Sequence, residues 1–313
     1  MTKFRQNHNR QRRKGNNFMI RIGLFAILLV GGLLFGFISL DDIIGSGNES
    51  AAQQKSNQSF SNEEYNPTPN KDRSFLPSVT GKNQLVHHQY YSLSYNEKHE
   101  IPEWVAYNLT RKSLEAKNVK RAKRFNSDPD VKSRSAKHND YSHSGYTRGH
   151  MAPAGDMAFN TQAMKETFYM SNMAPQIRPF NNGIWKELEE QVRDWAYDKE
   201  ELIVISGPIM TGIEEHIGNN KVGVPKSFFK ILVDQDGNRD DAIGFIIPHD
   251  VSDKRLQDYA MSIDDIEQKT GLDFFSHYYD DNKEDQVESS FNINRWKFDN
   301  KRYRLRVEKW NKE

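Results

Sequence analysis

Cysteine is absent from this chain of 313 residues. Its absence excludes a disulfide scaffold, a catalytic thiolate, and zinc or iron–sulfur sites built on cysteine ligands. It does not identify the compartment, because many exported proteins also lack cysteine. Hydrophobic residues make up only 36% of the chain, which is a small share for a protein that folds along its whole length. We therefore expect part of the sequence to lie outside any core.

Acidic residues are missing from the first 21 positions, which contain seven basic residues, and residues 22–40 contain no charge of either sign. The remaining 37 basic and 43 acidic residues give the rest of the chain a net charge of −6. A protein that coats nucleic acid without specificity is usually basic over its folded part. Any contact with phosphate is therefore expected to be local.

The uncharged stretch, Ile22–Leu40, is apolar or glycine except at Ser39. As a helix it would be about 28 Å long, enough to cross a ~30 Å hydrocarbon core. Basic residues precede it and Asp41 and Asp42 follow it, so the positive-inside rule predicts a cytoplasmic tail (1–21) and a domain on the periplasmic or extracellular face. A cleaved signal peptide, which would give a secreted protein, and a mitochondrial location are the alternatives. A signal peptide has a shorter apolar core of ~7–15 residues, so the pattern favours an uncleaved transmembrane anchor.

Beyond the anchor, residues 41–80 are rich in Ser, Asn, Gln, Gly and Pro, which predicts a flexible linker. Residues 81–313 then form the folded domain. Apolar patterning predicts strands over 88–95, 104–109, 202–205, 228–233 and 242–247, and helices over 182–197 and 262–270. Strands and helices do not alternate regularly, which indicates an α+β fold with a mainly antiparallel central sheet.

The segment most suggestive of chemistry is Thr147-Arg148-Gly149-His150, followed by Met-Ala-Pro. Its glycine and the following proline make it a poor helix and a poor central strand. Arginine binds a phosphate ester through its forked guanidinium, and a neutral histidine accepts a proton from water near pH 7. Taken alone, such a pair is more often an ordinary surface feature.

Two further polar residues lie on the predicted helix over 182–197 or at its start. Asn181 stands at the start, and Glu189 lies eight residues on, about 80° round a regular helix, so both could face one cleft. An amide oxygen and a carboxylate suit a hard cation such as Mg²⁺. The plainer interpretations are a helix N-cap for Asn181 and a solvated face for Glu189.

The order and spacing of these segments resemble the DNA/RNA non-specific endonuclease family, the ββα-metal nucleases that include mitochondrial endonuclease G. The family's Asp-Arg-Gly-His motif is similar to residues 147–150, and its Asn-x-x-Pro-Gln segment matches residues 172–176. Its metal-binding Asn and its Glu fall on Asn181 and Glu189, with the family's nine- and eight-residue spacings. The resemblance extends over about residues 81–312.

An upstream arginine, four residues before an aromatic residue that leads into an Asp, also belongs to the family pattern. Arg121 fits best, ahead of Phe125 and Asp128, while Lys123 and Arg124 compete for the role. The first motif residue departs from the family, because Thr147 replaces Asp. Threonine offers one hydroxyl, which still accepts a hydrogen bond.

The resemblance implies a ββα-metal active site and an endonuclease that hydrolyses phosphodiester bonds in DNA and RNA with Mg²⁺, for which Mn²⁺ can substitute. The implied site residues are His150 as general base, Arg148 and Arg121 as phosphate ligands, Asn181 as metal ligand, Glu189 as holder of a metal-bound water, and Asn172 as support for the His150 loop. Two alternatives stay open. One is a catalytically weak or inactive surface protein that binds nucleic acid, for example in DNA uptake. The other is a metal phosphodiesterase for smaller substrates.

Overall fold

The computed structural model describes residues 64–69, 71–133, 135–235 and 239–312. The predicted basic tail, the anchor over residues 22–40 and most of the predicted linker lie outside the described residues. Among the residues that are described, no helix is long and apolar enough to cross a membrane.

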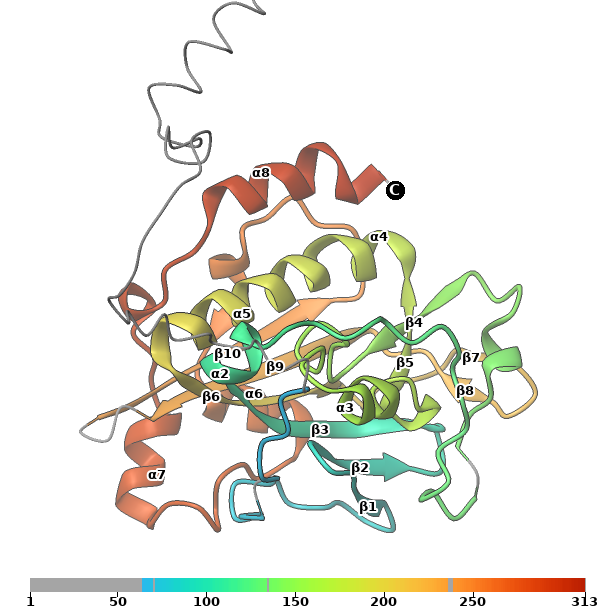
Figure 1. The fold of residues 1–313 in the computed structure, drawn as a ribbon, viewed down its shortest axis with the longest axis horizontal. Helices are drawn as coiled ribbons and strands as arrows, with labels where there is room; N and C mark the ends of the chain where they lie inside the picture. The colour runs from blue at the N-terminus through green and yellow to red at the C-terminus, as the bar shows by residue number, and fades with distance from the viewer. Residues whose placement is uncertain (1–63, 70, 134, 236–238, 313) are drawn as a thin grey trace, which may run out of the picture. The chain divides into compact units, whose positions relative to one another are not determined.

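A seven-stranded sheet with strand order β1-β2-β3-β6-β9-β10-β11 forms the centre of the domain (Figure 1). All its neighbouring strands are antiparallel. This confirms the predicted α+β class with a mainly antiparallel sheet. The strands are β1 (Gln84–His87), β2 (Ser92–Asn96), β3 (Ile101–Thr110), β6 (Glu201–Pro208), β9 (Ser227–Gln235), β10 (Asp240–Pro248) and β11 (Ala260–Met261).

Two short antiparallel ribbons and a set of helices surround the sheet. The ribbons pair β4 (Tyr146–His150) with β5 (Met173–Ile177), and β7 (His216–Ile217) with β8 (Val222–Gly223). The α-helices are α2 (Arg111–Glu115), α3 (Thr161–Glu166), α4 (Arg178–Phe180), α5 (Lys186–Lys199), α6 (Ile263–Thr270), α7 (Asp281–Glu288) and α8 (Asn300–Glu308). A π-helical segment, η4 (Asn181–Trp185), joins α4 to α5, and the 3₁₀ turns are η2 (His138–Tyr141), η3 (Met170–Asn172), η5 (Leu256–Tyr259), η6 (Ile293–Arg295) and η7 (Trp310–Lys312).

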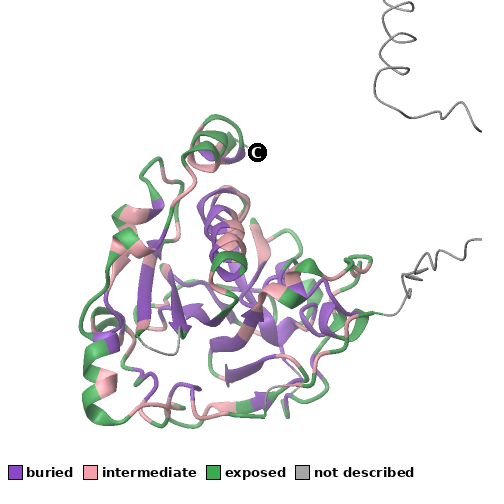
Figure 2. Ribbon diagram, turned by 60° about the vertical axis from the view of Figure 1, so that its left-hand side comes forward, coloured by how far each residue is buried: buried purple, intermediate pink, exposed green. Residues whose placement is uncertain are grey.

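Both faces of the sheet are covered, because alternate side chains along β3 and β6 enter two different hydrophobic clusters. Val105 and Leu202 belong to the cluster that holds the apolar side of α5. Ile203 belongs to the other, which holds residues of α6 and α7. Figure 1 shows α5 and α7 on opposite sides of the strands, with α8 beyond α5. In Figure 2 the buried residues gather in the sheet and along α5, while α7 and α8 are mostly exposed.

Most predicted elements agree with the structure. The predicted strands over 104–109, 202–205, 228–233 and 242–247 lie within β3, β6, β9 and β10, and β9 and β10 pair as the predicted hairpin. The predicted helix over 262–270 is α6, which Ser262 caps at its N-terminus and which ends at Gly271 with a left-handed φ of 70°. Glycine adopts that conformation at no steric cost, so it ends the helix.

Two expectations were right only in part. Residues 92–95 of the predicted strand over 88–95 lie in β2, but residues 88–91 form the turn between β1 and β2. The aromatic residues of this turn serve tertiary packing: Tyr91 is buried and donates a hydrogen bond to the Glu166 carbonyl. The predicted linker also extended too far, since residues 64–69 and 71–80 pack on the domain. Phe75 and Leu76 are buried in its core, and the Trp104 indole donates to the Ser78 carbonyl at 3.2 Å.

Candidate active site

The β4–β5 ribbon carries the Thr147–His150 motif, away from the centre of the large sheet. His150 is paired with Met173 and Arg148 with Pro175. A side chain at Gly149 would collide with that of Gln176 on the facing strand, so the ribbon requires glycine at this position. Strand β5 leads directly through α4 and η4 into α5. The described chain therefore places two strands and a helix around one point, as the ββα resemblance implies.

His150 lies in an aromatic environment. Its ring makes an edge-to-face contact with Phe168, with centroids 5.1 Å apart, and a tilted contact with Phe125 at 5.9 Å. The side chain is buried, and its Nε2 atom has no hydrogen-bond partner among the described residues. Burial, with a smaller effect from the positive charge of Arg121, lowers the pKa of His150 to about 3. The imidazole is therefore neutral near pH 7, with a nitrogen lone pair available to accept a proton.

Arg121 and Arg148 approach His150 from two different segments, and aromatic faces hold both guanidinium groups. The Cζ atom of Arg121 is 5.1 Å from the centre of the Phe168 ring, and that of Arg148 is 5.2 Å from the Phe125 ring. Arg148 also donates a hydrogen bond to the His138 carbonyl at 3.2 Å. These contacts fix the direction of two positive charges beside the imidazole.

A cleft of about 390 Å³ brings the predicted residues together. Five of the six predicted site residues line it, whereas Lys123 and Arg124, the competitors of Arg121, are not among its lining residues. The lining consists of Arg121, Phe125, Arg148, His150, Pro153, Ala154, Gly155, Asn181, Asn182, Lys186, Glu189, Glu190 and Arg193. Four of these are Arg or Lys and two are Glu, so the cleft is locally basic although the chain outside the N-terminal tail is acidic.

Asn172, the sixth predicted residue, is fully buried behind the cleft. Its Oδ1 accepts a hydrogen bond from the Ala152 backbone nitrogen at 2.8 Å. Its Nδ2 donates to the Ala152 carbonyl at 3.0 Å and to the Thr167 carbonyl at 2.9 Å. The side chain therefore fixes the segment that follows His150 without facing the cleft itself.

The interpretation of Asn181 as a helix N-cap is wrong. Asn181 has helical backbone angles (φ −61°, ψ −46°) and lies between α4 and η4, inside a continuous helical path. Its Nδ2 donates to the Thr147 hydroxyl at 2.9 Å, and that hydroxyl donates to the Gln176 carbonyl at 2.8 Å. Thr147 thus accepts a hydrogen bond from Asn181 through its hydroxyl. Because Asn181 Nδ2 is held in this way, its Oδ1 is left as the atom that can bind a cation.

Glu189 faces the same cleft from α5, although the helix is not regular between it and Asn181. Gly183 has non-helical angles (φ −96°, ψ −111°) and produces a kink there. Helix irregularities of this kind are frequent at functional sites. Burial raises the pKa of Glu189 to about 7, while the positive charges of Lys230 and Arg193 act in the opposite direction.

Three charged residues behind Glu189 were not predicted from the sequence. Arg193 donates to Asp156 at 2.9 Å, and Asp156 also accepts a hydrogen bond from the Tyr107 hydroxyl at 2.7 Å. Lys230 is buried on β9 with its Nζ 4.9 Å from the Trp185 ring centre and no hydrogen-bond partner among the described residues. A lysine within the apolar run Phe-Phe-Lys-Ile-Leu-Val is the one local signal that could have revealed it.

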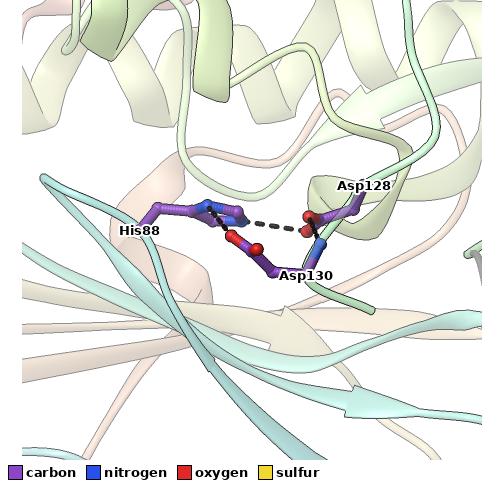
Figure 3. A group of neighbouring side chains, drawn as sticks. All are labelled: His88, Asp128 and Asp130. Atoms are coloured by element: carbon purple, nitrogen blue, oxygen red, sulfur yellow. Dashed lines mark hydrogen bonds and ion pairs between the residues drawn. The ribbon is translucent and has the colours of Figure 1, made fainter. Parts of the chain in front are cut away.

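A second polar cluster, outside the cleft lining, consists of His88, Asp128 and Asp130 (Figure 3). His88 Nε2 is 2.9 Å from Asp128 Oδ2, and His88 Nδ1 is 3.6 Å from Asp130 Oδ2. Asp128 also accepts hydrogen bonds from the Ser171 hydroxyl and the Asp130 backbone nitrogen. Because both ring nitrogens face carboxylates, His88 links the turn after β1 to the loop around Asp128 and, through Ser171, to the segment before β5.

Comparison with known proteins gives a consistent result. A family model described as DNA/RNA non-specific endonuclease matches residues 73–281. The chain is 37% identical to the mitochondrial nuclease EXOG of Xenopus laevis over 223 residues, which are 66% of this chain and 62% of that protein. It is 36% identical to EXOG of Danio rerio over 199 residues, or 58% of each chain. It therefore matches only about three fifths of the length of these two relatives.

Two further similarities come from a fungal protein and a solved structure. Nuclease C1 of Cunninghamella echinulata var. echinulata is 36% identical over 202 residues, covering 59% of this chain and 80% of that protein. A chain in the crystal structure of the EndoG/EndoGI complex superposes with a TM-score of 0.59 at 31% identity, covering 64% of this chain and 88% of that one. The family match spans every strand of the large sheet, the β4–β5 ribbon and the residues of the cleft, and the chain belongs to the DNA/RNA non-specific endonuclease family.

Proposed function

We propose that the protein is a metal-dependent endonuclease that hydrolyses phosphodiester bonds in DNA and RNA without sequence specificity. One observation carries the proposal: a buried, neutral imidazole with an unpartnered Nε2 lies in one basic cleft with two arginines, an oriented amide and a carboxylate. This set combines a proton acceptor, anion ligands and hard oxygen donors at a single point. The names of EXOG and Nuclease C1 describe the same class of activity.

His150 is the group that takes a proton from the attacking water. Its low pKa keeps it unprotonated across the physiological range, and its aromatic contacts hold the ring in one orientation. General-base catalysis contributes about 10²–10⁴-fold. Asn172 acts indirectly, since its three hydrogen bonds to backbone atoms fix the segment directly after His150.

Arg121 and Arg148 bind the scissile phosphate. Each guanidinium lies over an aromatic ring, so it is positioned before the substrate arrives. Preorganised positive charge at the site where negative charge develops is a large contribution to phosphoryl-transfer catalysis. Lys186 and Arg193, which also line the cleft, add to the attraction for the nucleic-acid backbone.

The donor atoms in the cleft fit a Mg²⁺ ion, for which Mn²⁺ can substitute. Asn181 offers Oδ1 as the metal ligand, because Thr147 holds its Nδ2, and the Glu189 carboxylate on the same cleft would hold a metal-bound water. An amide oxygen completed by water suits Mg²⁺. When bound, the ion supplies charge stabilisation for the phosphate and the leaving oxygen. Thr147 keeps the hydrogen bond that orients Asn181, which favours an active enzyme over an inactive relative.

We also propose that residues 22–40 anchor the protein in a membrane, with the nuclease domain on the periplasmic or extracellular face. The charge pattern around this apolar stretch supports the orientation. A non-specific nuclease in the cytoplasm would attack the cell's own genome. Protease added to spheroplasts should release an active fragment, whereas full protection of the domain would reverse the topology.

The test of the nuclease function uses purified protein with supercoiled plasmid and with a structured RNA. Cleavage of both in Mg²⁺ and its loss with chelator is the expected result. Binding without cleavage would indicate a surface receptor for nucleic acid, and hydrolysis only of small phosphodiesters would indicate the third class of function. His277→Ala, at an exposed histidine, serves as a variant that should leave the rate unchanged.

A further inference from the structure

A group of carboxylates lies between α6 and α7, on the face of the sheet opposite α5. Asp264 and Glu267 are three residues apart on α6 and therefore share one side of that helix. Glu288 is the last residue of α7. One oxygen from each of the three side chains lies within 4.8 Å of the others, and none of the three lines the active-site cleft.

Glu288 is the member that indicates a missing partner. The residue is only 4% exposed, and its Oε1 atom is buried with no hydrogen-bond partner in the described part of the chain. A buried carboxylate without a partner is costly, because it loses its hydration and gains nothing in return. The carboxylate that carries this unpartnered atom also contributes an oxygen to the group with Asp264 and Glu267, so one ligand could satisfy all three side chains.

The charges around this group are mostly of the same sign. Besides its two neighbours in the group, Glu288 is influenced by the negative charges of Glu284 and Asp273. Lys283, the basic residue of α7, is directed to Asp240 at 3.6 Å. Burial and then repulsion between carboxylates raise the pKa of Glu288 to about 9. Burial also raises the pKa of Glu267 to about 7, although its Oε1 accepts a hydrogen bond from the Phe274 backbone nitrogen.

We propose that Asp264, Glu267 and Glu288 form a second cation site, specific for Ca²⁺, which joins α6 to α7 and is separate from the active site. The donor set contains only carboxylate oxygens, which excludes a preference for zinc or copper. Ca²⁺ accepts several carboxylates at ~2.3–2.6 Å in irregular geometry, whereas Mg²⁺ requires a near-ideal octahedron and gives up water reluctantly. Three carboxylate side chains from two helices therefore fit Ca²⁺ better than Mg²⁺.

The ion acts on stability and not on cleavage. It replaces the protons that burial and mutual repulsion otherwise keep on Glu288 and in part on Glu267, and it binds only when α6 and α7 are folded side by side. A ligand of this kind raises the melting temperature in proportion to the logarithm of its concentration. When the free Ca²⁺ concentration is about 100 times the dissociation constant of the site, the Tm of a domain of this size should rise by roughly 5–10 °C.

The experiment measures thermal unfolding of the full-length chain, purified in detergent, with chelator or with added CaCl₂ at neutral pH. Three proteins are compared: the wild type, Glu288→Gln, and Asn181→Ala, which lacks the proposed ligand in the cleft. Calcium should raise the Tm of the wild type and of Asn181→Ala equally, and that of Glu288→Gln by less than a third as much. In chelator Glu288→Gln should melt close to the wild type, because Glu288 is already uncharged at neutral pH when no ion is bound.

Asp264→Asn provides a second variant if Glu288→Gln does not fold, with the same expected loss of the calcium effect. The proposal is overturned if calcium leaves the wild-type Tm unchanged or raises that of Glu288→Gln equally. A calcium effect that disappears in Asn181→Ala would also overturn it, because the ion would then bind in the active-site cleft. An equal rise with MgCl₂ would refute the specificity for Ca²⁺.

Discussion

Thr147 provides a sharp test of how the cleft is organised. Its hydroxyl accepts a hydrogen bond from Asn181 Nδ2 at 2.9 Å and donates one to the Gln176 carbonyl at 2.8 Å. Thr147→Val keeps the shape of the side chain and removes both bonds. At about 0.5–1.5 kcal/mol for each bond, the free energy of unfolding should fall by roughly 1–3 kcal/mol. The Asn181 amide would then lose the contact that orients it.

The functional effect should exceed what this loss of stability explains. Removing a group that orients a metal ligand typically costs about 10–100-fold in metal affinity. The Mg²⁺ concentration that gives half-maximal plasmid cleavage should therefore rise by about that factor, while the rate at saturating Mg²⁺ changes less. Thr147→Ser, which retains a hydroxyl, is the matched control and should behave like the wild type.

The assay combines initial cleavage rates over a range of Mg²⁺ concentrations with urea unfolding of the same three proteins. If Thr147→Val keeps the wild-type Mg²⁺ dependence while losing the expected stability, the hydroxyl is only structural. The account of Asn181 as an oriented ligand would then be refuted.

Three further predictions follow from the site. Asn181→Ala should raise the Mg²⁺ requirement and lower the rate together, whereas Asn181→Asp should retain metal binding because a carboxylate is also a hard oxygen ligand; cleavage rates over a Mg²⁺ titration check both. Burial lowers the pKa of His150 from 6.5 to about 3. Its contribution to the free energy of unfolding is therefore complete above pH 6.5 and is lost as the pH falls toward 3. Urea unfolding at neutral and acid pH should show that His150→Gln loses less free energy of unfolding at acid pH than the wild type does. The proposed base acts on water and the arginines act on phosphate, so single- and double-stranded DNA and RNA should all be cut, with strong inhibition by salt.

Each of these has an outcome that would contradict it. An unchanged Mg²⁺ requirement in Asn181→Ala would remove that residue from the metal site. Equal acid loss in the wild type and His150→Gln would mean that His150 is not the buried neutral group described. Discrete bands from plasmid, or rates on DNA and RNA that differ by about 10³-fold, would indicate base or sugar recognition. That difference equals about 4 kcal/mol, more than shape preference supplies.

The elements that could be predicted from sequence are those whose own residues carry the pattern. Strands β9 and β10 have apolar runs on both sides of a turn, and α6 has its Ser262 cap and its Gly271 end within ten residues. The segment 64–80 lacks such a pattern: its composition is polar, and Phe75 and Leu76 fix it through contacts with distant strands. Its packing therefore could not be inferred locally.

The same distinction applies to the residues of the cleft. Motif spacing identifies His150 and Asn181 as site residues, but it does not predict the protonation state or the orientation of their side chains. His150 is neutral because Phe125 and Phe168 surround it, and Asn181 is oriented by a hydroxyl 34 residues earlier. Lys230, on strand β9 and distant from Glu189 in the sequence, lowers the pKa of the Glu189 carboxyl by its positive charge. Burial and long-range charge, which arise only in the folded chain, determine the chemistry of these groups.

The central claim is that His150 is the base of a nuclease, and the most direct measurement compares plasmid cleavage by His150→Ala and wild-type protein under saturating Mg²⁺. The expected result is a fall of at least ~10²-fold in a variant that still unfolds in one cooperative transition at neutral pH, with a lower melting temperature because the buried ring no longer packs on Phe168 and Phe125. A variant that folds normally and keeps more than about a tenth of the wild-type rate would contradict it, because that residual rate exceeds what loss of a general base allows.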